Sequence, residues 1–134
     1  MSLVVYDTYA WVEYFIGSEK GIRVREYLRS GGVTPSVVLA ELARKYLREG
    51  FRPGEVEKRL EFVASRTAIA PIDVGLSLRA AEVYLRLLKR ARERSLRTPS
   101  LADAIVYATA LVTGEDLLTG DSLFEGLDSV IYLG

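Results

Sequence analysis

Four acidic residues occupy places where an ordinary surface acid is not expected. Asp103 lies within an apolar stretch, and Glu41 has apolar residues on both flanks. Asp7 directly follows a short apolar run near the N-terminus, and Asp121 follows a glycine near the C-terminus. A carboxylate in apolar surroundings is costly unless a charged group compensates it. Each of these four acids therefore needs a partner or a local structural role.

Three of the four acids do have a local interpretation. Asp7 suits the N-cap of a following helix, and Asp103 suits a capping box with Ser100. Asp121 suits an ordinary turn, whereas Glu41 lies too deep in its helix to act as a cap. These local interpretations stay open beside a shared one.

The shared interpretation is a metal site. Four carboxylates in one place would repel each other, and a divalent cation relieves that repulsion. The chain has no histidine and no cysteine. The ligands would therefore be hard oxygens, which favour Mg²⁺ or Mn²⁺ and chemistry at a phosphate. We expect the carboxylates of Asp7, Glu41, Asp103 and Asp121 to lie within reach of one ion.

Short apolar runs alternate with amphipathic segments along the whole chain. Strands are expected at residues 3–6, 33–35, 67–72, 116–119 and 129–133. Helices are expected at residues 8–16, 19–29, 37–48, 55–65, 76–93 and 100–114, with one helical turn at 122–125. This alternation predicts an α/β fold with a parallel β-sheet sandwiched by α-helices in three Rossmann-like layers. The carboxyl ends of the strands then form one rim, where all four acids are expected.

Three finer expectations concern individual helices. Ser36 is placed to cap the helix at 37–48. The helix at 8–16 has more aromatic residues than one core-facing stripe needs, so both core packing and a partner surface remain open. The helix at 76–93 is expected to turn one apolar stripe to the core. That stripe comprises Leu78, Ala81, Tyr84, Leu85, Leu88 and Ala91.

Composition narrows the class of protein. The 134 residues suit a single domain, 1–134, and the formal net charge of zero gives no bulk argument for nucleic-acid binding. No apolar run approaches the roughly 20 residues of a membrane span, so a soluble cytoplasmic protein is expected. The absence of Asn, Gln and Cys fits a protein from a thermophile.

Four motifs in this order resemble those of the PIN-domain ribonucleases, specifically the small VapC-type toxins. The motifs are Val4–Thr8, Pro35–Leu42, Ser100–Ala104 and Leu118–Phe124, and each contains one of the four acids. The resemblance covers essentially the whole chain. It implies a PIN-like fold and a metal-dependent endoribonuclease in which these acids bind Mg²⁺ or Mn²⁺ and are catalytic. It also implies an RNA substrate, a homodimer and an antitoxin protein that blocks the site.

Other residues are candidates to support such a site. Thr8 and Thr119 have hydroxyls that would orient carboxylates, although ordinary threonines at strand ends are an equally open interpretation. Phosphate contacts must come from outside an acidic site. Two basic groups are candidates for RNA binding: Arg44, Lys45 and Arg48 beyond Glu41, and Arg92, Arg94 and Arg97 before Asp103. Solvated, salt-bridged helix faces are the alternative for both groups.

Rival functions are disfavoured to different degrees. A haloacid-dehalogenase-type phosphatase needs a second acid two residues after the first, where this chain has Tyr9. A receiver domain needs a lysine near its last strand, and none follows Lys89. A DNA-directed 5′ nuclease needs additional DNA-binding elements for which the chain lacks room. A non-catalytic PIN-like module that binds RNA or protein remains the alternative function.

Overall fold

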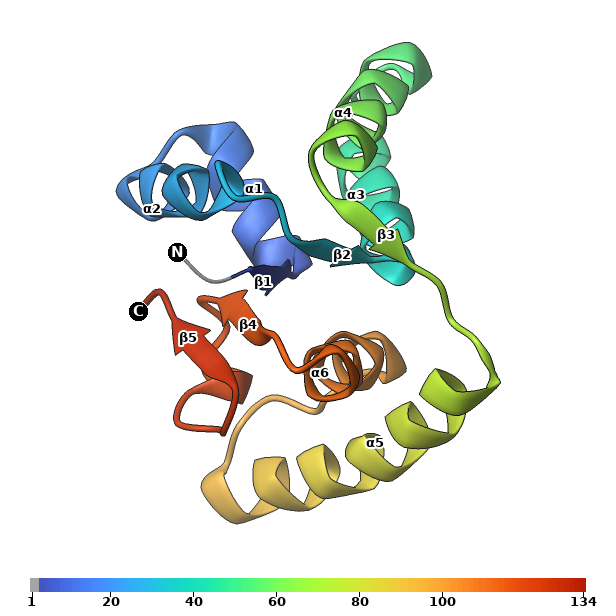
Figure 1. Cartoon of the computed structure of the whole chain (residues 1–134), viewed down its shortest axis with the longest axis vertical. Helices are drawn as coiled ribbons and strands as arrows, with labels where there is room; N and C mark the ends of the chain where they lie inside the picture. Colours follow the sequence, from blue (N-terminus) through green and yellow to red (C-terminus); the bar gives the residue numbers. More distant parts are fainter. Residues whose placement is uncertain (1–2) are drawn as a thin grey trace.

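A five-stranded parallel sheet forms the centre of the computed structural model, which describes residues 3–134 (Figure 1). The strand order is β3-β2-β1-β4-β5, and every neighbouring pair is parallel. The strands are β1 (Val4–Tyr6), β2 (Val33–Pro35), β3 (Ala68–Ala70), β4 (Asp116–Thr119) and β5 (Val130–Tyr132). The predicted parallel α/β sheet is therefore confirmed.

Helices cover both faces of this sheet, as Figure 1 shows. One face carries α1 (Thr8–Ile16), α2 (Glu19–Leu28), α3 (Ser36–Arg48) and α4 (Pro53–Arg66). The other face carries α5 (Val74–Arg94) and α6 (Leu101–Thr113), and the short 3₁₀ helix η1 (Ser122–Phe124) follows β4. No helix within residues 3–134 is long and apolar enough to cross a membrane.

The burial of β1 and α6 explains why their sequences are so apolar. All three residues of β1 are fully buried, because β1 lies in the middle of the sheet with β2 and β4 on its sides. In α6, every residue from 104 to 110 is buried, since this helix lies between the sheet and α5. An apolar surface all round is what a helix enclosed in a core requires. Asp103 lies just before this enclosed part.

Prolines explain several differences between the expected and observed element boundaries. The predicted cap at Ser36 is wrong, because α3 begins at Ser36 itself and the preceding Pro35 makes no side-chain capping bond. Helix α4 begins at Pro53, since proline is well tolerated in the first turn of a helix. Strand β3 ends at Ala70, directly before Pro71.

The predicted core-facing stripe of α5 is also wrong for most of its residues, although Ala91 is buried as expected. Leu78 and Leu85 are 68% and 66% exposed. The helix instead buries a neighbouring stripe, which comprises Leu76, Ala80, Val83, Leu87 and Ala91. This helix carries apolar residues around more than half of its circumference, and the pattern alone does not say which part faces α6. The result is an exposed apolar stripe on the outside of the molecule.

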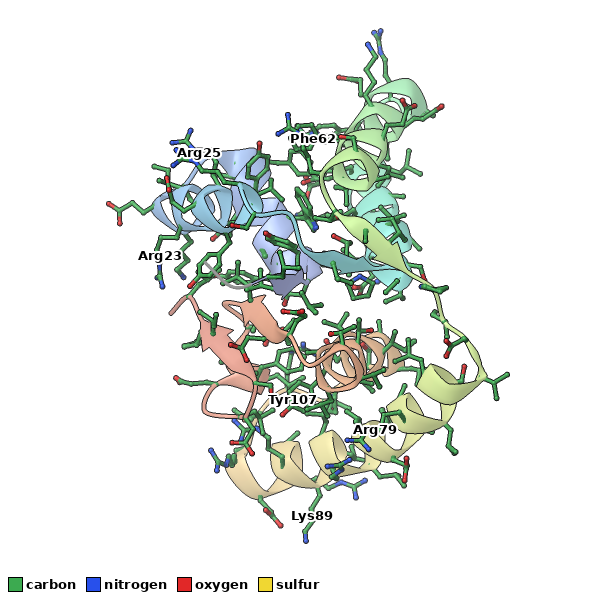
Figure 2. The ribbon with its side chains drawn as sticks, viewed as in Figure 1. Arg23, Arg25, Phe62, Arg79, Lys89 and Tyr107 are labelled. Carbon is green, nitrogen blue, oxygen red and sulfur yellow. The ribbon has the colours of Figure 1, made fainter. Side chains whose placement is uncertain are left out.

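The aromatic residues of α1 serve mainly as core. Trp11 is fully buried, and its indole N–H donates a hydrogen bond of 3.1 Å to the Thr34 hydroxyl. Tyr14 stacks on Phe62 of α4 with 5.6 Å between ring centroids, and Figure 2 shows Phe62 pointing toward α1. Phe15 packs against the same ring. The core interpretation is therefore confirmed for these three residues of α1.

Candidate functional site

A cavity of about 350 Å³ is lined by all four acids identified in the sequence. Asp7 directly follows β1, and Asp121 follows β4 after one intervening residue. Glu41 lies in the second turn of α3, and Asp103 lies in the first turn of α6. Strands β1, β2 and β4 are parallel, so α1, α3 and η1, which follow them, begin at one rim of the sheet. Helix α6 leads into the opposite end of β4 and therefore also begins at that rim. Four elements that are far apart in sequence thus each supply one carboxylate.

Asp7 is the most buried of the four acids, at 6% exposure. Its Oδ1 accepts a hydrogen bond of 2.8 Å from the backbone N–H of Ala10 and so caps α1. Burial raises the pKa of Asp7 to about 7, and hydrogen bonds from Thr119 and Ala10 offset only part of that rise. The negative charges of Asp121 and Glu41 raise it further. Within residues 3–134, Asp7 forms no salt bridge that would offset this rise.

Both candidate threonines contact the acids. The Thr8 hydroxyl donates a hydrogen bond of 2.7 Å to Oε1 of Glu41. The buried Thr119 hydroxyl accepts one of 3.0 Å from the backbone N–H of Asp121 and also hydrogen-bonds the Asp7 carboxylate. Thr8 thus links Glu41 to the start of α1, and Thr119 links Asp7 to the end of β4.

Arg97 lies inside the acidic site, a position that the sequence analysis missed. Its Nη1 and Nη2 atoms donate to the two carboxylate oxygens of Asp103 at 2.8 and 2.9 Å. Nη2 also donates to Oδ2 of Asp121 at 2.5 Å. The sequence left RNA binding and a salt-bridged surface role both open for Arg97, and its proximity to Asp103 along the chain was the only signal of this ion pair. Arg97 is thus a partner of the acids.

The ion pair alters both side chains. Burial works to raise the pKa of Asp103, but the hydrogen bonds from Arg97 and Ser100 outweigh it and hold that pKa below its usual range. The same hydrogen bonds to Asp103 and Asp121 raise the pKa of Arg97. Asp103 and Ser100 also form the predicted capping box at the start of α6. Asp103 is therefore an ionised carboxylate with both oxygens occupied.

The four acidic side chains, as they are placed here, do not form a complete metal-binding group. Within residues 3–134, no three acidic side chains lie close enough together to hold an ion. The expectation that all four carboxylates share the reach of one ion is therefore not met, because Arg97 already occupies Asp103 and Asp121. The donor chemistry still fits Mg²⁺ or Mn²⁺, since four carboxylates line one cavity and every one is a hard oxygen donor. Asp7 and Glu41 have no cationic partner in the described part of the chain.

The other basic candidates lie at different distances from this cavity. Arg44 lines a second hollow, of about 290 Å³, together with Glu41 and Ser100, so it lies at the edge of the acidic site. Lys45 forms an ion pair with Glu49. Arg48 on α3 and the pair Arg92 and Arg94 in the last turn of α5 are exposed. Arg44 is therefore the basic residue placed beside the acids without pairing to them.

The family of the chain follows from its match to a known protein family. A family model described as PIN domain matches residues 4–129, which is nearly the whole chain. The chain belongs to the PIN domain family. The four acids of this PIN domain lie at the rim where the sequence analysis expected them. No curated protein matches this chain by sequence.

Solved structures of similar fold extend the comparison. A toxin–antitoxin complex from Klebsiella pneumoniae matches with a TM-score of 0.68 and 19% identity, covering 98% of each chain. DNA-bound VapBC from Salmonella typhimurium matches with a TM-score of 0.68 and 20% identity over 100% of both chains. VapC20 from Mycobacterium tuberculosis, a Sarcin-Ricin loop cleaving toxin, matches with a TM-score of 0.62 and 18% identity, covering 94% of this chain and 92% of that one. At these identities the similarity is one of fold.

Proposed function

We propose that this PIN domain is a metal-dependent endoribonuclease that hydrolyses RNA phosphodiester bonds. The observation that carries the proposal is the convergence of four carboxylates, from four separate elements, on one cavity. Membership of the PIN family supports it. The proposed ion is Mg²⁺ or Mn²⁺, because the donor set consists of carboxylate oxygens.

The four acids and the two threonines of the site each have a role in the proposed reaction. Asp7, Glu41, Asp103 and Asp121 would hold the ion. A bound divalent ion supplies Lewis-acid chemistry, which activates water and polarises a phosphodiester. Thr8 keeps the Glu41 carboxylate oriented through their 2.7 Å hydrogen bond. At the end of β4, Thr119 hydrogen-bonds the Asp7 carboxylate and accepts a hydrogen bond from the backbone N–H of Asp121.

RNA contacts and protein partners complete the proposal. Arg44 at the edge of the cavity, and Arg48 one turn further along α3, would contact phosphates next to the scissile one. The similar structures include VapBC and other toxin–antitoxin complexes, so we propose that this chain is the toxin of a type II toxin–antitoxin pair. We propose further that the whole chain is one domain that acts as a homodimer.

The substitution Asp103→Asn tests the catalytic proposal. Asparagine keeps the size of the side chain and removes the charge that an ion requires. RNA cleavage in the presence of Mn²⁺ should fall on the order of 100-fold or more, since even the outer partners of metal ligands contribute about 10–100-fold. Initial rates on transcripts of differing structure, with EDTA addition and Mn²⁺ readdition, give the measurement.

Asp116→Asn provides the matched control. Asp116 is exposed at the start of β4, at the opposite end of that strand from the cavity. Thermal unfolding of both variants shows whether they fold. Wild-type cleavage by a folded Asp103→Asn variant contradicts the proposal. A wild-type protein that binds RNA or a protein partner but cleaves no transcript favours the non-catalytic alternative.

A further inference from the structure

The guanidinium of Arg97 occupies the position of a cation between two of the four acids. It covers both oxygens of Asp103 at 2.8 and 2.9 Å and one oxygen of Asp121 at 2.5 Å. The remaining oxygen of Asp121 accepts a hydrogen bond of 3.0 Å from the backbone N–H of Leu123. An ion that used these two carboxylates would share both oxygens of Asp103 with Arg97, and at Asp121 only Oδ1 is free of Arg97.

The charges around the cavity are unevenly compensated. Asp103 and Asp121 share Arg97, whereas Asp7 and Glu41 accept hydrogen bonds only from uncharged donors within the described residues. A divalent ion placed among all four acids would lie close to the guanidinium, and the two positive groups would repel each other. An ion and Arg97 that bound Asp103 and Asp121 at the same time would therefore weaken each other's binding.

Arg97 is able to leave without disturbing the acids. It lies in the loop between α5 and α6, and its side chain is 44% exposed. Asp103 stays in place without it, because Oδ2 of Asp103 also accepts hydrogen bonds from the backbone N–H and the hydroxyl of Ser100 at 2.7 and 3.0 Å. The carboxylates are thus positioned by their helices, and Arg97 contributes charge.

We propose that Arg97 is a built-in counter-cation that competes with a divalent metal ion for Asp103 and Asp121. It neutralises part of the negative charge of the acidic rim in the metal-free protein and weakens the affinity for the ion. This inference rests on the proposed metal-dependent function. A merely orienting role for Arg97 has the opposite consequence, because loss of an orienting residue weakens metal binding.

Mn²⁺ binding to the metal-free full chain distinguishes these two roles. Titration calorimetry, or detection of free Mn²⁺ by electron paramagnetic resonance, gives the dissociation constant for wild type, Arg97→Ala and Arg97→Lys. We expect Arg97→Ala to bind Mn²⁺ at least about tenfold more tightly, because a charge-assisted ion pair of this kind must otherwise be broken. Arg97→Lys keeps the positive charge but not the forked guanidinium geometry. Its dissociation constant for Mn²⁺ should lie between those of wild type and Arg97→Ala.

Arg92→Ala is the matched control, since it removes one positive charge from the last turn of α5 without touching the acids. Thermal unfolding gives a second readout. In EDTA, Arg97→Ala should unfold at a lower temperature than Arg92→Ala, and saturating Mn²⁺ should close or reverse that difference.

The outcomes separate this inference from the proposed function. If wild type binds Mn²⁺ and Arg97→Ala binds it no more tightly than Arg92→Ala does, competition by Arg97 is wrong and the metal-dependent function stands. If no variant binds Mn²⁺, Arg97→Ala included, the metal-dependent function and the competition both fail. Should Arg97→Ala not fold, a dissociation constant for Arg97→Lys equal to or weaker than that of wild type overturns the inference.

Discussion

Three of the four site acids also stabilise the start of a helix. Asp7 caps α1, Asp103 forms a capping box with Ser100 at α6, and Asp121 caps η1 through the N–H of Leu123. The starts of α1 and η1 follow parallel strands, and α6 begins at the same rim because it runs back to the opposite end of β4, so the free N–H groups of all three starts face this rim. The capping and site interpretations of these acids are therefore compatible, because one location serves both.

Asp7 makes the stability of the metal-free protein depend on pH. Its folded-state pKa of about 7 lies above the ordinary value of 3.8 that applies in the unfolded chain. The folded protein binds this proton more tightly, so the contribution of Asp7 is fully present below about pH 4 and is lost as the pH rises through 7. The free energy of unfolding should fall by up to about 1.4 kcal/mol per pH unit across that window.

Urea unfolding in EDTA at pH 5 and pH 8 measures this effect when wild type is compared with Asp7→Asn. Asparagine keeps the capping role and cannot ionise. The stability advantage of Asp7→Asn over wild type should be larger at pH 8 than at pH 5. An advantage that does not change with pH contradicts the assignment to Asp7.

At the scale of elements, Gly21 sets how closely α1 and α2 pack. A Cβ atom built at Gly21 would lie 2.0 Å from the backbone carbonyl oxygen of Glu13. Gly21→Ala must therefore push α2 away from α1, and we expect a loss of about 1–3 kcal/mol in the free energy of unfolding. Denaturant unfolding gives that value.

Gly54→Ala is the control for that substitution. Gly54 lies in the first turn of α4, where an added Cβ would meet nothing within 4 Å. It should stabilise the protein by about 0.4–1 kcal/mol, because alanine reduces the freedom of the unfolded chain. Equal effects of the two substitutions would show that close helix packing is not what requires Gly21.

The predicted helices and strands agree with the structure where the sequence signal is local, and they differ from it where the outcome depends on distant contacts. The bounds of α1 and β4 are those expected. Gly17 ends α1 before α2, and Gly114 ends α6 before β4, both in the left-handed conformation. The buried face of α5 could not be predicted, because both of its apolar stripes have helical spacing. Only contact with α6 decides which stripe is covered.

At the scale of the whole molecule, the exposed stripe of α5 supports the proposed homodimer. Val74, Leu78, Ala81, Leu85 and Leu88 alternate in steps of four and three residues, the spacing of a helix–helix seam. Val74 and Leu78 are 88% and 68% exposed. A hydrophobic stripe of this length on an outer helix is typical of an interaction surface.

We propose a second copy of the chain as the partner on this stripe. In an antiparallel pair of α5 helices centred on Ala81, Val74 meets Leu88, since each lies seven residues from that centre. Asp73 and Lys89 lie eight residues from it on opposite sides, so each Lys89 faces the Asp73 of the other copy. Figure 2 shows Lys89 projecting outward from α5. The small Ala81 at the centre allows the helices to approach closely.

Light scattering coupled to size-exclusion chromatography tests this interface. Wild type should have twice the chain mass, and the double substitution Leu78→Glu with Leu85→Glu should have the mass of one chain. Ile16→Glu replaces a residue of 67% exposure on α1 and should leave the dimer intact. A monomeric wild type, or a double variant that remains dimeric, removes α5 as the interface.

The sequence by itself determined the parallel α/β fold and the four acids, because alternating apolar runs and strand ends are local patterns. It also determined that a site without histidine or cysteine must use oxygen donors. Only the tertiary structure decided that Arg97 lies among those acids and that α5 leaves its second apolar stripe exposed. Both depend on how a loop and a helix fold back onto distant parts of the chain, and neither is encoded in spacing along it.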